Sequence, residues 1–517
     1  MSSVACLKPT RAGSQPTIGA YMSISSVLAI DQGTTGTTCL VIGQDGTILG
    51  RAYSEFTQHF PQPGWVEHDA LEIWNTTVHV ARAAIDEASG ADICAVGITN
   101  QRETVVLWDR ETLEPVHRAI VWQDRRTTDV CRELKSAGHE SEVRARTGLV
   151  LDPYFSGTKI QWILDRDPDL RSRAESGELA AGTIDSWLLA RLTDGTVHAT
   201  DPTNASRTLL FHLTEGVWDP WLLDLLGVPK SLLPEVRPSS GDFGIASGVH
   251  LGIEAPIAGI AGDQQAALFG QGCWSPGLAK NTYGTGAFLL LNTGEEAVPS
   301  TRGLLTTAAC NEKGGLAYAL EGSVFIAGAA IQWLRDGLGL LEVAEQSEAM
   351  ARSVEDNSGV YFVPALVGLG APHWVPDARG MLVGLTRGTK REHIVRAALE
   401  AMAYGTMDVL QTMEEEAALE TQELRVDGGA ALNDWLIQFQ ADVLGIRLRR
   451  PEIVETTALG AAGLAGLATG VWSDADDFLS VQGSGTQCEP RMSETDRSAL
   501  KTEWDRAVRA AIQWAGD

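Results

Sequence analysis

The chain has 517 residues, more than one hydrophobic core usually organises, so we expect at least two large domains. Its hydrophobic content of 44% and charged content of 21% are those of a globular protein and argue against a disordered chain. The formal net charge of −27 disfavours nucleic acids and anionic membranes as partners, because both attract clustered Lys and Arg.

The chain carries no recognisable export or membrane signal. Residues 1–23 lack the apolar segment of a signal peptide, and we interpret them as a disordered leader. The seven cysteines are scattered without a CxxC pair, which is typical of reduced thiols. The apolar stretch 459–472 is short and rich in glycine, so we expect a tightly packed buried helix there. We therefore predict a cytoplasmic protein with no membrane insertion.

The first part of the chain, residues 24–271, alternates strands and helices. Short strands are expected at 27–30, 38–43 and 47–56, with a turn at 44–46 between the last two. Apolar residues three and four positions apart predict a helix over 70–88. Further along we expect two strands around a polar break in 91–109, a helix over 180–195, and a strand, polar break and helix in 255–272.

The second part, residues 272–517, opens with the same pattern of strand, Gly/Thr turn and strand over 279–294. Helices are expected in 325–339, 391–413 and 493–515, and a strand with a glycine turn in 423–439. The fold class is therefore α/β. We predict two domains, 24–271 and 272–517, each with a mixed sheet flanked by helices, and an active-site cleft between them.

Two turns consist almost entirely of glycine and threonine, at 31–36 (DQGTTG) and 282–286 (TYGTG). Glycine permits close backbone approach and threonine adds a hydroxyl donor, so such turns suit phosphate oxygens. Asp31, at the end of a strand, is placed to hold Mg²⁺. The alternative is a pair of ordinary β-turns. The chain has neither a P-loop nor a Rossmann glycine motif.

A second group of polar residues suits a small polyol, which needs hydrogen-bond partners and one apolar wall. Arg102 and Glu103 lie in a polar break after an apolar strand, where a surface ion pair is the alternative. Tyr154 offers a phenol, with a half-buried aromatic residue as its alternative. Asp263 and Gln264 follow another apolar strand, where Asp263 could instead be a helix N-cap.

In their order, DQGTTG, TYGTG and VDGG (426–429) resemble the nucleotide-contacting elements of the actin/hexokinase-type superfold. Within it, the chain from about residue 27 resembles the FGGY carbohydrate kinases, and among these most closely the glycerol kinases. The stretches that carry this resemblance are 100–109, 121–126, 152–164, 259–272, 280–290, 321–338, 368–374, 379–389 and 425–442.

The resemblance implies two RNase H-like domains and the activity of an ATP:glycerol 3-phosphotransferase, with Asp263 as general base and Mg²⁺ at Asp31 and Asp263. A homodimer or homotetramer is expected on the same ground. The residues that match the family's polyol site are Arg102, Glu103, Trp122, Tyr154, Asp263, Gln264 and Phe288. Those expected at ATP are Thr34, Thr35, Gly36, Thr285, Gly328, Gln332, Gly429 and Asn433.

One position departs from the family pattern. Thr38 stands where glycerol kinases carry an arginine that helps neutralise nucleotide phosphate. Loss of such a charge-assisted contact is expected to weaken nucleotide binding by about 1.5–3 kcal/mol. The alternatives are an FGGY kinase for another polyol or ketose, and a nucleotide-dependent sensor without turnover.

Overall fold

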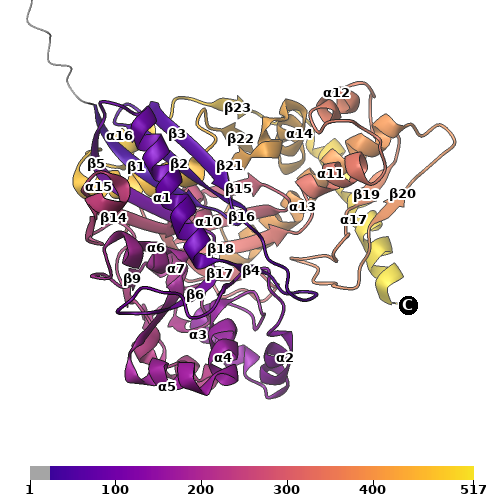
Figure 1. Ribbon diagram of the computed structural model, residues 1–517. Helices are drawn as coiled ribbons and strands as arrows, with labels where there is room; N and C mark the ends of the chain where they lie inside the picture. Colours follow the sequence, from indigo (N-terminus) through magenta and orange to yellow (C-terminus); the bar gives the residue numbers. More distant parts are fainter. Residues whose placement is uncertain (1–23, 517) are drawn as a thin grey trace, which may run out of the picture.

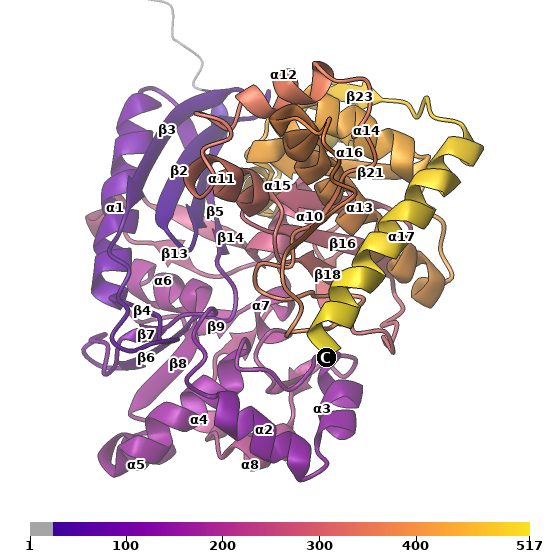
Figure 2. The same ribbon diagram turned by 90° about the vertical axis from the view of Figure 1, so that its right-hand side faces the viewer.

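The computed structural model describes residues 24–516; the leader interpreted above, residues 1–23, lies outside them. Within the described residues the chain forms two large mixed sheets with helices between and outside them (Figures 1 and 2). The α/β class with a mixed sheet in each part is confirmed. Over this range, no helix combines the length and the apolar character needed to cross a bilayer.

The first sheet is built from residues 25–262. Its strands, in spatial order, are β13 (Ile245–Ala246), β14 (Ala255–Gly262), β5 (Asp92–Asn100), β1 (Ser25–Gln32), β2 (Gly36–Gly43) and β3 (Ile48–Glu55). β14, β5 and β1 run parallel, whereas β1, β2 and β3 pair antiparallel. Residues 27–30 are apolar without alternation because both faces of β1 are buried.

The second sheet is built from residues 279–488. Its strands, in spatial order, are β17 (Leu305–Cys310), β18 (Leu316–Val324), β16 (Ala287–Gly294), β15 (Ala279–Tyr283), β21 (Glu423–Gly428), β22 (Arg447–Arg450) and β23 (Thr486–Cys488). β15, β21 and β22 run parallel and the other pairs antiparallel. The expected strand, turn and strand over 279–294 are confirmed.

Helices cover the outer face of each sheet. α1 (Ala70–Glu87), α6 (Ile184–Leu192) and α9 (Gly248–Leu251) pack on the first sheet. α11 (Gly328–Asp336), α12 (Gln346–Arg352), α13 (Arg391–Ala417), α14 (Asp434–Leu444) and α17 (Glu494–Gly516) pack on the second. In Figure 2, α1 and the yellow helix α17 lie on opposite sides of the molecule.

Two helices fill the space between the sheets in the described chain, α10 (Asp263–Gly270) and α15 (Thr456–Thr469). Although α15 comes late in the sequence, it packs on β1, β5 and β14 of the first sheet. Glycines bring these backbones together: a Cβ at Gly460 would overlap the carbonyl oxygen of Ala266, and one at Gly97 that of Ala461. The apolar stretch at 459–472 thus forms a helix as expected, but the helix is buried only as far as Gly466 and ends at Thr469. α16 (Ala475–Ser480) follows it.

A smaller lobe, at the bottom of Figure 1, is attached to the first sheet. It contains the sheet β4 (Glu67–His68), β7 (Ala119–Ile120), β6 (Val105–Asp109) and β8 (Leu179–Thr183). Its helices are α2 (Thr128–Ser136), α3 (Glu140–Thr147), α4 (Ser156–Arg166), α5 (Pro168–Ser176), α7 (Pro202–Ala205), α8 (Pro220–Leu226) and the 3-10 turn η1 (Lys230–Leu232).

Short strand pairs are β9 (Ala199–Thr200) with β12 (Glu235–Val236), β10 (Phe211–His212) with β11 (Val217–Trp218), and, beside the second sheet, β19 (Tyr361–Val363) with β20 (Met381–Val383).

Two local expectations were wrong. Residues 180–195 are not one helix: residues 179–183 pair antiparallel with β6, and α6 begins only at Ile184. Pairing with β6 overrides the high helix propensity of the two alanines in this segment, whereas Gly182 is a poor helix former in any case. No polar break separates β14 from α10 either, because the helix begins at Asp263, directly after the strand.

Candidate functional site

The carboxyl ends of β1, β5 and β14 meet at one edge of the first sheet. In the strand register, Gln32 lies opposite Asn100, and Asn100 lies opposite Gly262. After β1 the chain enters the Gly/Thr turn, after β5 it reaches Arg102 and Glu103, and after β14 it reaches Asp263. Segments far apart in the sequence are therefore side by side, because the strands are parallel and end at the same level.

Arg102 is buried at this edge, with 3% of its surface exposed. Its Nε lies 3.2 Å from Asp263 Oδ1 and 3.9 Å from Glu103 Oε1. Glu103 is buried as well. The alternative of a surface ion pair for these two residues is therefore excluded, and their charges need partners inside the protein.

Glu321 and Arg207 supply those partners, and the sequence analysis missed both. Arg102 donates through Nη1 to Glu321 Oε2 at 2.5 Å and through Nη2 to Oε1 at 3.1 Å. Arg207 donates to Glu321 Oε1 at 2.9 Å and to Glu103 Oε1 at 2.6 Å. Burial by itself would raise the pKa of Glu321, but the two guanidinium groups hold it at about 2. The carboxylate is therefore ionised and binds both arginines.

The sequence held a signal for one of these residues. Glu321 is the lone acid in the apolar strand 316–324 (LAYALEGSV), and a buried charge in such a strand needs a cation beside it. Arg207 lies in a mixed polar loop after α7 and gave no comparable signal. Glu321 belongs to the second sheet, so this charge cluster joins the two parts of the molecule.

Glu103 has a strained backbone, with φ of 63°. A non-glycine residue in the left-handed region costs on the order of 1 kcal/mol and persists only where its surroundings hold it. Here the Arg207 ion pair holds the side chain, and Ser156 Oγ donates to the Glu103 carbonyl at 3.0 Å. Such strain is typical of a functional site.

Trp122 and Tyr154 form an aromatic wall next to this cluster. Their ring centroids are 5.6 Å apart in an edge-to-face arrangement, and both side chains are half-buried. The ammonium group of buried Lys159 donates to the Tyr154 carbonyl at 2.5 Å, which fixes the turn before α4. Phe288 lies on β16 of the second sheet, in register with Thr282 and Ser323, on the face that also carries Glu321.

Lys280 is a further buried cation that the sequence analysis did not single out. Its Nζ donates to Gln264 Oε1 and, at 2.8 Å, to Thr282 Oγ1. Burial lowers the pKa of Lys280 to about 8, against the attraction of Asp427 and Asp263. Because Lys280 occupies the amide oxygen of Gln264, the amide N–H groups are what this side chain can offer to a ligand.

Asp31 and Asp263 lie at the same edge of the first sheet, Asp31 near the end of β1 and Asp263 directly after β14. Burial, and next to it the charge of Asp263, raises the pKa of Asp31 to about 7. Burial also raises the pKa of Asp263, with Arg102 and Lys280 acting in the opposite direction. Asp263 is the first residue of α10 and Gly262 its N-cap, so the N-cap alternative for Asp263 is wrong. Among the described residues, no group of three or more His, Cys, Asp or Glu side chains is placed to hold a metal ion.

The turn at 33–36 lies beside these carboxylates. The N–H of Gly33 donates to the Gly36 carbonyl at 2.9 Å and closes the turn. Thr34 is half-buried and accepts the indole N–H of Trp122 at 2.9 Å, whereas Thr35 is exposed. A Cβ at Gly36 would overlap the ring of Tyr53, so this position requires glycine.

The turn at 282–286 is fastened to the start of α11. The N–H of Ala327 donates to the Thr285 carbonyl at 2.9 Å, and the N–H of Gly328 donates to Gly284 at 3.1 Å. The structure thus brings Thr285 and Gly328 together. Gln332 lies one turn further along α11 and is exposed.

Gly429 and Asn433 bracket the short 3-10 turn η2 (Gly429–Leu432) after β21. Asn433 is the N-cap of α14, its side chain accepting the Leu436 N–H at 2.9 Å, and its amide donates to Ser347 Oγ at 3.4 Å. β21 is parallel to β15, so this turn and the 282–286 turn lie at the same edge of the second sheet. The expected nucleotide residues of the second part therefore share one edge.

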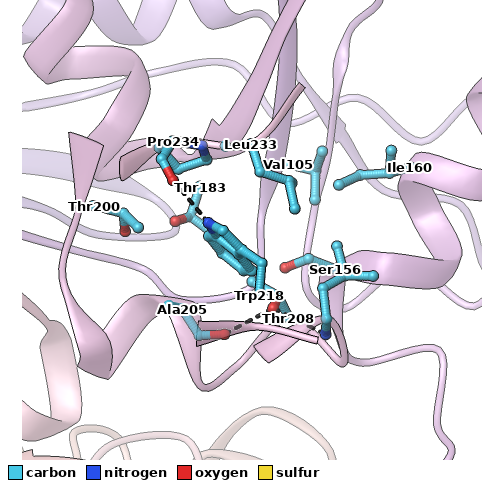
Figure 3. A pocket seen from close by; sticks show the side chains of 12 residues that line it. Val105, Ser156, Ile160, Thr183, Thr200, Ala205, Thr208, Trp218, Leu233 and Pro234 are labelled. Carbon is cyan, nitrogen blue, oxygen red and sulfur yellow. Dashed lines mark hydrogen bonds between the residues drawn. The ribbon is translucent and has the colours of Figure 1, made fainter. Parts of the chain in front are cut away.

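The small cavity in Figure 3 lies in the smaller lobe behind the charge cluster, and Ser156, which donates to the Glu103 carbonyl, is one of its lining residues. Its volume of about 10 Å³ is too small for a substrate or a cofactor. Trp218 borders it and donates its indole N–H to the Pro234 carbonyl at 2.8 Å, one of the dashed lines in Figure 3. This cavity carries no catalytic chemistry.

Comparisons with known proteins match nearly the whole chain. The family model for the N-terminal domain of the FGGY family of carbohydrate kinases matches residues 26–270, and that for the C-terminal domain matches 279–469. The chain is 58% identical over 491 residues to the glycerol kinase of Dechloromonas aromatica, covering 95% of this chain and 98% of the relative. It is 55% identical over 493 residues to that of Deinococcus radiodurans, covering 95% and 98%.

Solved structures agree with these matches. A crystal structure of Plasmodium falciparum glycerol kinase with ADP superposes with a TM-score of 0.90 at 35% identity, covering 95% of this chain and 98% of the other. A ligand-bound xylulose kinase from Lactobacillus acidophilus superposes with a TM-score of 0.85 at 20% identity, covering 95% and 99%, which is a likeness of fold alone.

The raised pKa of Asp31 predicts a pH-dependent stability in the absence of divalent cations. The unfolded chain loses this proton near pH 4 and the folded protein only near pH 7, so the free energy of unfolding falls between these values. We expect Asp31→Asn to raise the melting temperature relative to wild type by several degrees more at pH 8 than at pH 5, measured by differential scanning calorimetry in EDTA.

Asp45→Asn is the matched control for this experiment. Asp45 is exposed and its pKa is lowered by hydrogen bonds from Thr47, so its carboxylate is ionised at both pH values. Its replacement is expected to shift the melting temperature equally at pH 5 and pH 8. An equal shift for Asp31→Asn would show that Asp31 does not hold a proton in the folded protein.

Proposed function

The chain belongs to the FGGY family of carbohydrate kinases, and we propose that it transfers the γ-phosphoryl group of ATP to glycerol, giving sn-glycerol 3-phosphate and ADP. The observation that carries this proposal is the buried Arg102, held between Asp263, Glu103 and Glu321 beside an aromatic wall. Relatives named glycerol kinase, 55–58% identical over almost their full length, support the same substrate.

The polyol site is proposed to consist of the residues named from the sequence. Arg102 and Gln264 would donate to the hydroxyl groups, and Glu103 and Asp263 would accept from them. Trp122, Tyr154 and Phe288 would cover the carbons. A wall of this kind with paired donors and acceptors suits a three-carbon polyol because each hydroxyl then keeps a hydrogen-bond partner.

Phosphoryl transfer requires in-line positioning and charge stabilisation more than covalent participation of the protein. Asp263 would accept the proton of the terminal hydroxyl while that oxygen bonds to the γ-phosphorus and the bond to the ADP oxygen breaks. The raised pKa of the Asp263 carboxyl favours this role, since a more basic carboxylate accepts the proton more readily. Arg102, at 3.2 Å, keeps the carboxylate in place.

The nucleotide is proposed to lie between the two sheets. Thr34, Thr35 and Gly36 would meet its phosphates from the first sheet and Thr285 from the second. Gly328, Gln332, Gly429 and Asn433 would hold the rest of ATP. Two observations support this arrangement. The two turns of the second sheet lie at the same edge, and the Plasmodium falciparum glycerol kinase was crystallised with ADP.

The carboxylates of Asp31 and Asp263, at the same edge of the first sheet, fit a magnesium ion. Mg²⁺ commonly takes one or two protein carboxylates and completes its shell with phosphate oxygens and water, so a cluster of three acidic ligands is not needed. When bound with ATP, the ion would neutralise phosphate charge. Burial, and after it the charge of Asp263, raises the pKa of Asp31, and a bound cation would favour the ionised form of both carboxylates.

The remaining expectations are proposals as well. We place the domain boundary between residues 271 and 272, in the gap between the two family-model matches. The scattered cysteines favour the cytoplasm, and the family resemblance favours a homodimer or homotetramer.

The substrate is tested by coupled ADP release with MgATP, comparing glycerol with four- and five-carbon polyols and ketoses. We expect turnover with glycerol and little with the others. Preference for a longer polyol would overturn the substrate while leaving the family intact. Binding of nucleotide without turnover of any polyol would favour the sensor alternative.

Asp263→Asn tests the general base. The amide cannot accept the proton, so we expect kcat to fall by roughly 10²–10⁴. Glycerol binding measured by calorimetry distinguishes lost chemistry from lost affinity. A kcat within a few-fold of wild type would remove Asp263 from this role.

Thr38→Arg tests the departure from the family pattern. Thr38 lies in β2, opposite Asp31 on β1 and Tyr53 on β3, close to the proposed phosphate site. A charge-assisted contact is worth about 1.5–3 kcal/mol, so we expect the KM for ATP to fall about tenfold or more. Thr38→Gln, which is long but uncharged, is the control and is expected to give no comparable gain. An unchanged KM in the arginine variant would mean that other groups already neutralise the phosphate.

A further inference from the structure

We propose that Trp122 couples the polyol site to the phosphate-binding turn, so that bound glycerol raises the affinity of the protein for nucleotide. Its ring would pack against the polyol while its indole N–H sets the position and polarity of the Thr34 hydroxyl. The inference deepens the proposed function and rests on it, because the roles of Trp122 and Thr34 toward the substrates come from that proposal.

The hydrogen bond between these side chains has only one possible direction. Trp122 Nε1 lies 2.9 Å from Thr34 Oγ1, and an indole nitrogen only donates. The Thr34 oxygen must therefore accept, and its own proton is left for another acceptor. At the position proposed for ATP, that acceptor is a phosphate oxygen. Trp122 thus turns the threonine hydroxyl into an oriented donor toward the nucleotide.

The backbone of Thr34 is held from the other side by Gln58. The Gln58 amide donates to the Thr34 carbonyl at 2.9 Å, and its oxygen lies 2.7 Å from His68 Nε2. An amide oxygen only accepts, so His68 carries its proton on Nε2. Burial, together with the charge of His59, lowers the pKa of His68 to about 4, which keeps the ring neutral. With its carbonyl fixed, Thr34 depends on Trp122 for the position of its side chain.

A second chain of hydrogen bonds connects the backbone of Trp122 to the same turn. The Trp122 N–H donates to Thr104 Oγ1 at 3.2 Å, and the Thr104 hydroxyl donates to Gln101 Oε1 at 2.8 Å. The Gln101 amide then donates to the Gly33 carbonyl at 3.1 Å. Trp122 is therefore connected to both residues at the start of the turn, directly to Thr34 and through Thr104 and Gln101 to Gly33.

These contacts give a physical route for coupling. Trp122 is half-buried and contacts Tyr154 edge to face, so part of its ring surface is accessible to a polyol. A polyol packed on the ring restricts it and with it the Thr34 hydroxyl. A nucleotide that binds afterwards no longer has to order this group, so it binds more tightly. By thermodynamic reciprocity the nucleotide tightens glycerol binding by the same factor.

The test is calorimetric measurement of the Kd of MgADP with and without saturating glycerol in the full chain. Trp122→Phe keeps an aromatic ring but removes the donor, and Thr34→Val removes the acceptor while leaving the ring untouched. Trp218→Phe is the matched control: it removes an indole N–H from a bond of 2.8 Å, also on a half-buried tryptophan, whose partner Pro234 belongs to neither proposed site.

We expect glycerol to lower the Kd of MgADP about fivefold or more in the wild type, as is common for coupled sites. The ratio of the Kd without glycerol to the Kd with glycerol should stay at the wild-type value in Trp218→Phe. It should come within twofold of one in Trp122→Phe, in Thr34→Val and in the double variant. A wild-type ratio of one, or an unchanged ratio in Thr34→Val, would overturn the coupling. If the wild type bound no glycerol at all, the proposed function would fail first.

Discussion

The ion pairs of Glu321 with Arg102 and Arg207 are the interaction on which the arrangement of the site depends. Buried charges are tolerated only when they are paired and hydrogen-bonded, and loss of one partner typically costs about 3–5 kcal/mol. Glu321 comes from the second sheet, and the two arginines come from the first part of the chain. The proposed polyol residues therefore cannot separate from the second sheet without exposing unpaired charge.

The helix α10 extends this constraint to Asp263, its first residue. α10 lies between the sheets, and glycines bring its backbone into contact with α15. Its polar side chains reach the second sheet: Gln264 accepts from Lys280, and Gln265 donates to Thr307 Oγ1 at 3.1 Å. Asp263 is proposed to act between the polyol hydroxyl and the γ-phosphate of ATP. The phosphate would contact both sheets, so Asp263 needs such fixed support.

Hydrogen bonding also sets the polarity of the donors around the proposed phosphate site. Trp122 can only donate to Thr34, and Lys280 can only donate to Gln264, so each partner is left with donor groups for a ligand. Preorganised donors of this kind stabilise transferred charge without reorganisation during the reaction. The Trp122–Thr34 and Lys280–Gln264 hydrogen bonds thus position residues proposed for the polyol as well as residues proposed for the phosphate.

The sequence by itself determined the α/β class, the main strands and helices, and the Gly/Thr turns, because these depend on local periodicity and on the conformations open to glycine. It also singled out Arg102, Glu103 and Asp263, each at the end of an apolar strand. Only the tertiary structure decided that Arg102 and Glu103 are buried, that Glu321 and Arg207 pair with them, that Lys280 binds Gln264, and that α15 packs on the first sheet. The reason is that most of these contacts join residues more than 100 positions apart, and partners at such distances leave no mark on local sequence spacing.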